Sequence, residues 1–224
     1  SNKINGKRNC KSNSLCIRRK SKRNCNAFTI TSTDNNTVTS LKANAEALAK
    51  AALDSATLGS GQFCTKPGIM VIPTGPEGDE FLNHIESYLA TLQVAPLLNK
   101  GIADRYSTAT AKLAIDSKLK VFKGKTTDTG FGVEPTVFVV DWEVAKSNHE
   151  LLEEHFGPTS VIIRSNFENF ASVANNMEGQ LCAALHAANG ENVLELLDIL
   201  AEKAGRVIMN GFPTAVAVTA AMQH

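Results

Sequence analysis

Residues 161–210 read VIIRSNFENFASVANNMEGQLCAALHAANGENVLELLDILAEKAGRVIMN, and short apolar runs alternate there with amphipathic segments. Apolar runs of four to seven residues are typical of strands that are buried on both faces. Between them, apolar residues recur every three or four positions, which predicts helices. The predicted strands are 161–164, 181–187 and 206–210. Because such alternation builds βαβ units, the sequence predicts an α/β fold with an open, mostly parallel twisted sheet and helices on both faces.

The same alternation extends toward the amino terminus. Ser40 can cap a helix whose apolar positions recur to about residue 56, and Gly59 and Gly61 follow it. A polar loop at 62–68 then precedes a buried strand at 69–73. Further elements are predicted as helices at 79–92 and 107–119 and as strands at 120–122 and 136–141.

Charge is distributed unevenly along the 224 residues. The first 33 residues hold nine of the 23 Lys and Arg side chains and no acid, so the remainder holds 14 bases against 22 acids. A segment this polar cannot bury enough surface to offset its ordering entropy. We therefore expect 1–39 to be a basic, disordered or non-native leader and 40–224 to be the folded domain. No aromatic residue is interleaved with these charges, which argues against a nucleic-acid-binding arm.

Several classes of protein are excluded by pattern. No apolar run approaches the roughly 20 residues that a membrane span needs, and no apolar segment follows the basic start as in a secretory signal. The five cysteines include no CxxC pair, so neither a disulfide framework nor a metal site is indicated. No P-loop or complete dinucleotide-binding glycine motif occurs. We expect a cytoplasmic protein with no membrane partner and no metal.

Cys64 is the candidate reactive residue. It lies in GQFCTKPG, residues 61–68, a polar loop bounded by glycines between a helix and a strand. A nucleophilic thiol needs an open approach and backbone donors for an oxyanion, and a glycine-containing loop can provide both. Lys66 could lower the thiol pKa, although the sequence does not give the direction of its side chain. Cys182, inside a predicted strand, is interpreted as a small buried hydrophobe.

Four segments along the chain match known motifs in order and spacing. They are GQFCTKPG (61–68), EPT (134–136), EEHFGP (153–158) and GRVIMNGFPT (205–214). Together they resemble the aldehyde dehydrogenase superfamily, the first as its active-site cysteine motif and the third as its Glu-x-Phe-Gly-Pro motif. The last is similar to the branch that oxidises α-ketoglutaric semialdehyde (2,5-dioxovalerate). The resemblance runs from about residue 41 to the end and implies the family's cysteine-bearing catalytic domain.

This resemblance implies a role for five residues. Cys64 takes the place of the nucleophile that attacks an aldehyde, forms a thiohemiacetal and then a thioester, and is freed by hydrolysis. Its backbone N–H takes the place of an oxyanion donor. Glu154 and Phe156 match the residues that position the nicotinamide ribose and ring of NADP or NAD. Phe63 and Thr65 flank the nucleophile and are expected to line the substrate pocket.

The chain also departs from the family pattern. The family's coenzyme-binding domain has no counterpart in these residues, and its general-base glutamate is expected near residue 30, where 27–38 holds Asp34 as its one acid. We therefore expect a cysteine-bearing domain that is inactive alone and that self-associates through exposed domain-interface surface. Two alternatives remain at this point: a cysteine-dependent esterase, and a non-enzymatic folded module with a basic interaction tail.

Overall fold

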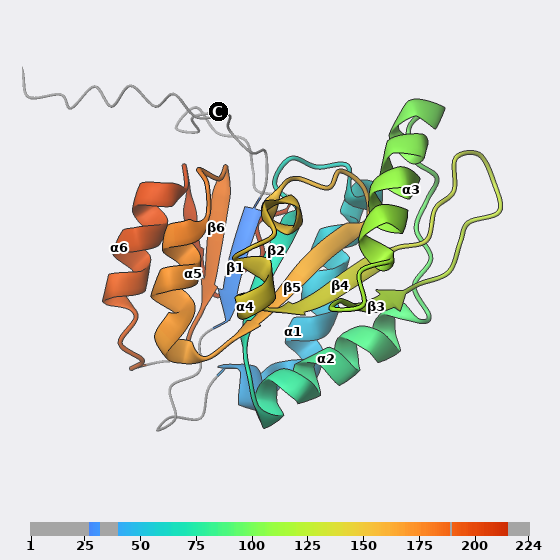
Figure 1. The fold of residues 1–224 in the computed structure, drawn as a ribbon. Coiled ribbons are helices and arrows are strands. Elements are labelled where there is room, and N and C mark those ends of the chain that lie inside the picture. The colour runs from blue at the N-terminus through green and yellow to red at the C-terminus, as the bar shows by residue number, and fades with distance from the viewer. Residues whose placement is uncertain (1–26, 32–39, 189, 215–224) are drawn as a thin grey trace, which may run out of the picture.

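A seven-stranded sheet organises the residues that the computed structural model describes, which are 27–31, 40–188 and 190–214 (Figure 1). The strand order is β3-β4-β5-β2-β1-β6-β7. β3 is antiparallel to β4, and every other neighbouring pair is parallel. The strands are β1 (Ala27–Thr31), β2 (Pro67–Pro73), β3 (Lys120–Lys123), β4 (Thr136–Asp141), β5 (Thr159–Ser165), β6 (Cys182–His186) and β7 (Val207–Met209). The predicted open, mostly parallel α/β sheet is confirmed.

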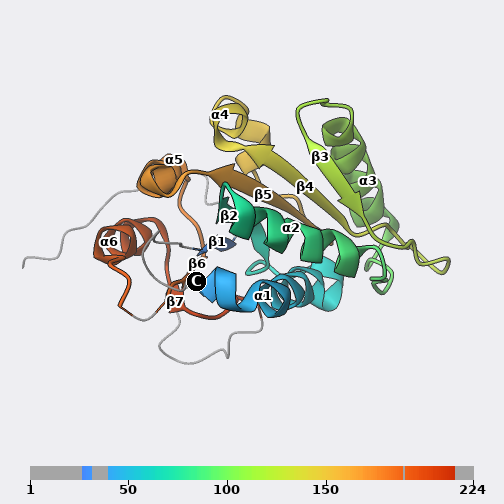
Figure 2. The same cartoon turned by 90° about the horizontal axis from the view of Figure 1, so that it is seen from below.

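Helices cover both faces of the sheet, as predicted. In Figure 2, α1 and α2 lie below the sheet, whereas α3, α4 and α5 lie above it. The α-helices are α1 (Ser40–Thr57), α2 (Pro76–Leu89), α3 (Lys100–Ala114), α4 (Trp142–Ala145), α5 (Phe170–Asn176) and α6 (Leu194–Lys203). Short 3-10 turns are η1 (Leu58–Gly61), η2 (His149–Leu152) and η3 (Phe167–Asn169).

Side chains of the central strands alternate between two apolar cores. Ile69 and Val71 of β2 pack into the core formed with α4, α5 and α6, whereas Met70 and Ile72 pack against α1 and α2. Every residue of β2 is buried. Because alternate side chains of a strand point to opposite faces, a strand covered on both sides must be apolar throughout. This is the pattern that the sequence shows.

Strand β1 corrects the expected boundary of the leader. Residues 27–31 were included in the basic segment 1–39, yet they form a strand hydrogen-bonded to β2 on one side and β6 on the other. Ile30 is fully buried in the core. The run AFTIT is short and lies among Asn, Ser and Thr, so its place is determined by pairing with distant strands. The rest of the expected leader lies outside the described residues.

Helix α3 begins earlier than the predicted 107–119. Asn99 is its N-cap, and the Asn99 side chain accepts a hydrogen bond from the backbone N–H of Ile102 at 3.0 Å. This cap satisfies one of the donors that the first turn leaves unpaired. Leu113, near the end of α3, packs into the core shared by α4 and α5. The amino-terminal half of α3 extends beyond the sheet edge and forms one wall of the site described below.

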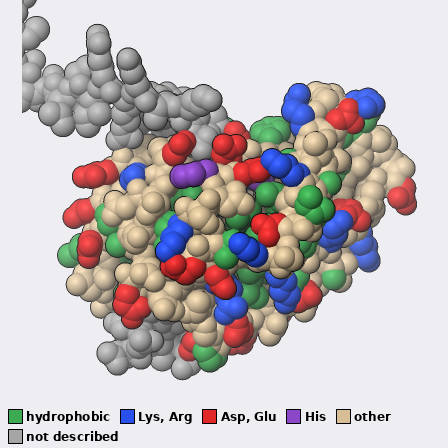
Figure 3. All heavy atoms as spheres, in the orientation of Figure 1, with side chains coloured by type: hydrophobic (Ala, Val, Ile, Leu, Met, Phe, Trp, Pro, Cys, Tyr) green, Lys and Arg blue, Asp and Glu red, His purple; other side chains and the backbone are tan. Residues whose placement is uncertain are grey.

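The surface carries both signs of charge. Figure 3 shows acidic and basic side chains interspersed over this face of the molecule. Several form ion pairs, including Lys112 with Glu150 at 2.7 Å and Lys123 with Glu134 at 2.8 Å. Among the described residues, no helix is long and apolar enough to cross a membrane.

Candidate active site

Two loops meet at the amino-terminal ends of strands β2 and β5. The loop that carries Cys64 leads into β2, and the segment 153–158 leads into β5. Since β2 and β5 are parallel neighbours, the residues that precede them lie side by side. The backbone N–H of Gly157 donates to the carbonyl of Gly61 at 3.2 Å and joins the two loops directly.

Gly61 permits this close approach. Its φ is +67°, and a Cβ built on it would lie 2.2 Å from the carbonyl oxygen of Gly157. A left-handed backbone conformation favours glycine, and the clash is with backbone that cannot move aside cheaply. Glycine at the first position of the cysteine motif is therefore required by contact between the two loops.

A Gly61→Ala substitution is expected to lower the free energy of unfolding by about 2–4 kcal/mol, the range of clearly destabilising single substitutions. Gly190→Ala is the matched control, because Gly190 also has a positive φ of +87° but nothing lies within 4 Å of its added Cβ. Urea unfolding of both variants separates the backbone strain from the clash. Equal losses in the two variants would contradict the close packing of Gly61 on Gly157.

Cys64 is exposed, as a nucleophile must be. Its neighbour Phe63 is 43% exposed, and Thr65 is half-buried. The hydroxyl of Thr214 donates to the carbonyl of Thr65 at 3.4 Å, so the segment that follows β7 reaches the cysteine loop. Cys182 is only 3% exposed, and burial raises the pKa of its thiol. This burial agrees with the interpretation of Cys182 as a structural hydrophobe.

Lys66 points into the protein. Its side chain is 1% exposed, and its ammonium group donates to the carbonyl of Thr159 at the start of β5. Burial lowers the pKa of Lys66 to about 8, and the charge of Glu154 opposes that shift. The direction of this side chain, which the sequence leaves open, is therefore toward β5 and Glu154.

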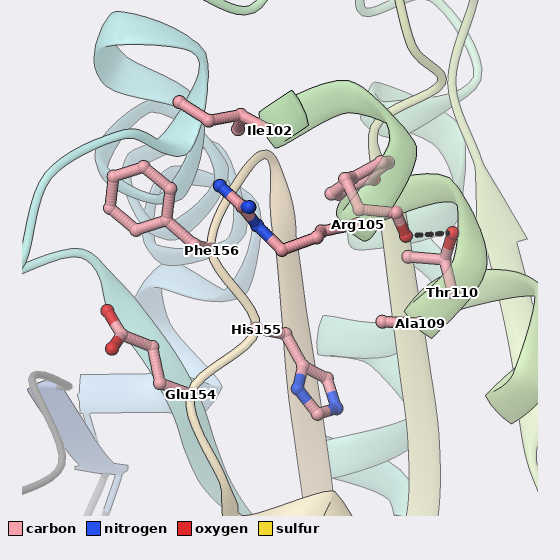
Figure 4. A pocket seen from close by; sticks show the side chains of 8 residues that line it. Ile102, Arg105, Ala109, Thr110, Glu154, His155 and Phe156 are labelled. Atoms are coloured by element: carbon pink, nitrogen blue, oxygen red, sulfur yellow. Dashed lines mark hydrogen bonds between the residues drawn. The ribbon is translucent and has the colours of Figure 1, made fainter. Parts of the chain in front are cut away.

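The segment before β5 presents its side chains alternately, as Figure 4 shows. His155 points toward Ala109 of α3, and Glu154 and Phe156 lie on the other side. The three residues line a groove of about 320 Å³ whose opposite wall is α3. Phe156 is 39% exposed. Burial raises the pKa of Glu154 and lowers the pKa of His155.

Arg105 and Tyr106 of α3 complete this groove, and the sequence analysis did not identify either residue. The guanidinium group of Arg105 lies near Phe156 in Figure 4. The buried hydroxyl of Tyr106 donates to the carbonyl of Glu134 at 2.6 Å and lies 3.2 Å from the carbonyl of Pro158. Desolvation raises the pKa of Tyr106, which keeps the hydroxyl protonated as a donor.

The four motif segments converge in space. The cysteine loop contacts 153–158 through Gly61 and Gly157, and 205–214 through Thr65 and Thr214. The segment 134–136 joins them, since the backbone N–H of Thr136 donates to the carbonyl of Pro158 at 2.9 Å. The expected position of the general base, near residue 30, is in β1, where Ile30 is buried. Within the described part of the chain, no group of three potential metal ligands occurs.

Comparison with known proteins identifies relatives along most of the chain. The aldehyde dehydrogenase family profile matches residues 17–222. The alpha-ketoglutaric semialdehyde dehydrogenase 2 of Azospirillum brasilense is 35% identical over 188 residues, covering 82% of this chain and 36% of the relative. The alpha-ketoglutaric semialdehyde dehydrogenase of Acinetobacter baylyi is 35% identical over 191 residues, with the same shares. The chain thus spans about a third of the length of these curated relatives.

Solved structures share the fold. Proline utilization A from Bdellovibrio bacteriovorus has a TM-score of 0.70 at 24% identity, covering 87% of this chain and 20% of that one. The delta-pyrroline-5-carboxylate dehydrogenase from Mycobacterium tuberculosis, bound with NAD, has a TM-score of 0.68 at 19% identity, and the match covers 90% of this chain and 36% of that one. Lactaldehyde dehydrogenase from Escherichia coli has a TM-score of 0.66 at 21% identity, and the match covers 86% of this chain and 39% of that one.

Proposed function

Because the chain belongs to the aldehyde dehydrogenase family, we propose that it supplies Cys64 as the nucleophile for NAD(P)-dependent oxidation of an aldehyde to a carboxylic acid. The observation that carries this proposal is the exposed Cys64 thiol on a loop hydrogen-bonded to the segment of Glu154 and Phe156. An exposed thiol on a rigidly held loop is suited to covalent catalysis.

The chemistry at Cys64 has two stages. The thiolate adds to the aldehyde carbon, and a C–S bond forms while the carbonyl oxygen becomes an alkoxide. The backbone N–H of Cys64 is the proposed donor to that oxygen. The hydride on this carbon would pass to the acceptor that a bound nicotinamide coenzyme supplies, which leaves a thioester. Water then attacks the thioester carbonyl carbon and gives up its protons to solvent. The C–S bond breaks, the acid is released and Cys64 returns as the thiolate.

We propose that the groove beside the cysteine loop holds the nicotinamide end of a coenzyme, which supplies the hydride acceptor when it is bound. Glu154 offers carboxylate oxygens that can accept hydrogen bonds from sugar hydroxyls. Phe156 offers an exposed aromatic face, and Arg105 offers a cation for an anionic group. These residue types match the sugar, ring and phosphate chemistry of such a coenzyme. NAD and NADP remain equal candidates.

The proposed substrate is 2,5-dioxovalerate or a similar semialdehyde. The names of the two curated relatives, at 35% identity, support this choice. Phe63 and Thr65 flank Cys64 and are the proposed lining of the substrate pocket. The hydroxyl of Thr214 donates to the Thr65 carbonyl, and this contact supports including the last motif segment in the proposed lining.

We also propose that these residues act as the cysteine-bearing domain of a cytoplasmic enzyme and need a coenzyme-binding domain for turnover. The chain covers 36% of the length of its curated relatives, which supports the proposal that a separate domain binds the coenzyme. The exposed side chains of Leu58, Phe63, Leu98 and Phe131 are proposed to take part in docking or self-association.

Acyl transfer tests the nucleophile without a coenzyme. The chain incubated with p-nitrophenyl acetate is expected to release nitrophenol and to carry an acetyl adduct on the Cys64 peptide, detected by mass spectrometry. Cys64→Ser should lose the thioester adduct, and Cys182→Ala should keep it, because Cys182 is buried. A folded wild-type chain with no adduct at Cys64 would overturn the proposal.

Oxidation is tested with 2,5-dioxovalerate and either NAD or NADP. The chain alone is expected to give no reduced coenzyme, since binding and reaction require groups held together in one geometry. Turnover that disappears in Cys64→Ala would support the assigned nucleophile and refute the proposed need for a further domain.

A further inference from the structure

Lys66 is a charged side chain placed where apolar side chains are expected. It is 1% exposed and is among the largest fully buried side chains of the described residues. Taking an ammonium group out of water is costly unless hydrogen bonds and opposite charge compensate. Because burying Lys66 costs stability, we examined which parts of the protein its contacts hold together.

The contacts of Lys66 join the two halves of the candidate site. Its backbone follows Cys64 on the nucleophile loop, and its backbone N–H donates to the carbonyl of Phe63 at 3.1 Å. Its ammonium group donates to Thr159, the first residue of β5. Glu154 lies in the segment that leads into this same strand, and its carboxylate is the opposite charge that acts on Lys66.

We propose that Lys66 is a positioning residue, whose buried ammonium group ties the Cys64 loop to the start of β5 and places a positive charge near the Glu154 carboxylate at the edge of the coenzyme groove. The proposal rests on the proposed function insofar as Glu154 is assigned to the coenzyme ribose. The tie itself is a property of this chain and can be measured without a coenzyme.

The physical reason is the partial burial of Glu154. Desolvation favours the protonated carboxyl group, and the charge of Lys66 acts in the opposite direction. A protonated Glu154 would lose part of its capacity to accept charge-assisted hydrogen bonds from sugar hydroxyls. The other cationic or titratable side chains that line the same groove are Arg105, Tyr106 and His155.

Carboxyl NMR of a chain labelled with ¹³C at glutamate side chains tests the inference directly. Glu154→Gln assigns the Glu154 resonance by its disappearance. Lys66→Met is expected to move the titration midpoint of Glu154 upward. Lys112→Met is the matched control, since Lys112 is exposed and pairs with Glu150 outside the groove. It should leave the Glu154 midpoint unchanged, and Arg105→Met measures the separate effect of the groove cation.

A double-mutant cycle provides a second readout that a merely structural lysine would not produce. Glu154→Gln is expected to lower the urea midpoint in the wild-type background, because it removes the charge that compensates Lys66. In the Lys66→Met background the same change should have little effect. The inference would be overturned if the effects of the two substitutions on the urea midpoint are additive and the Glu154 titration is unshifted in Lys66→Met.

These readouts separate the inference from the proposed function. A shifted Glu154 titration without acylation at Cys64 would support the role of Lys66 and contradict the assigned nucleophile. Acylation at Cys64 with an unchanged Glu154 titration would support the nucleophile and reject the role of Lys66.

Discussion

Iodoacetamide is expected to alkylate Cys64 at least about 10³-fold faster than Cys182 in the native protein. Cys64 is exposed on its loop, whereas Cys182 is 3% exposed in β6, a strand paired on both sides. A buried thiol reacts through local opening, and each 1.4 kcal/mol of opening free energy slows it about tenfold. Opening an internal strand by about 4 kcal/mol gives the expected ratio.

Peptide mapping by mass spectrometry measures the two rates, and it also separates them from the three cysteines of residues 1–26. Unfolding in urea is the control, because both thiols are then exposed and their rates should converge. Comparable rates in the native protein would contradict the burial of β6 or the exposure of the cysteine loop. Comparable rates that result from slow alkylation of Cys64 would remove the structural basis for assigning Cys64 as the nucleophile.

Lys66→Met is expected to stabilise the protein at pH 7 by up to about 3 kcal/mol. Burial lowers the pKa of Lys66 from 10.5 to about 8, and a shift of this size corresponds to about 3 kcal/mol of differential stability. Below pH 8 the folded wild type carries the full cost of a buried cation. The unpaired Thr159 carbonyl in the variant offsets part of the gain.

The sign of the pH dependence follows from proton binding. Between pH 8 and 10.5 the unfolded chain keeps the Lys66 proton while the folded chain has lost it, so wild-type stability rises with pH. The Lys66→Met variant lacks this rise, and the two proteins should converge near pH 10.5. Urea unfolding at several pH values measures the difference.

Lys112→Met serves as the control for this series as well. Its side chain is 64% exposed and pairs with Glu150 at the surface, so its removal should change stability by less than about 1 kcal/mol at any of these pH values. If the Lys66→Met and wild-type curves remain parallel from pH 7 to 10.5, Lys66 is not buried as a cation.

The parallel sheet could be predicted because strands buried on both faces have runs of apolar residues that are visible in the local sequence. Strands β2, β4, β5 and β6 each contain an uninterrupted run of at least three apolar residues, and glycines or capping residues separate them from helices. Strand β1 has no such apolar run. Its five residues become a strand only through pairing with β2 and β6, which lie far along the chain.

The candidate site was predictable where its residues form compact motifs, and not where single side chains arrive from elsewhere. Cys64, Glu154 and Phe156 stand in recognisable segments. Arg105 and Tyr106 lie on an amphipathic helix whose spacing is ordinary, and the Tyr106 contacts to Glu134 and Pro158 exist only after folding. The Asn99 cap is the local signal that could have extended this helix toward them.

The position of the Cys64 loop at the amino-terminal edge of the sheet has a consequence for protein engineering. Many α/β enzymes use the opposite edge for ligands, so altering the turns there risks their chemistry. In this chain the turns after β2 and β5 lie a full strand length away from Cys64. Fluorescent labels or affinity tags inserted at those turns should leave the thiol accessible.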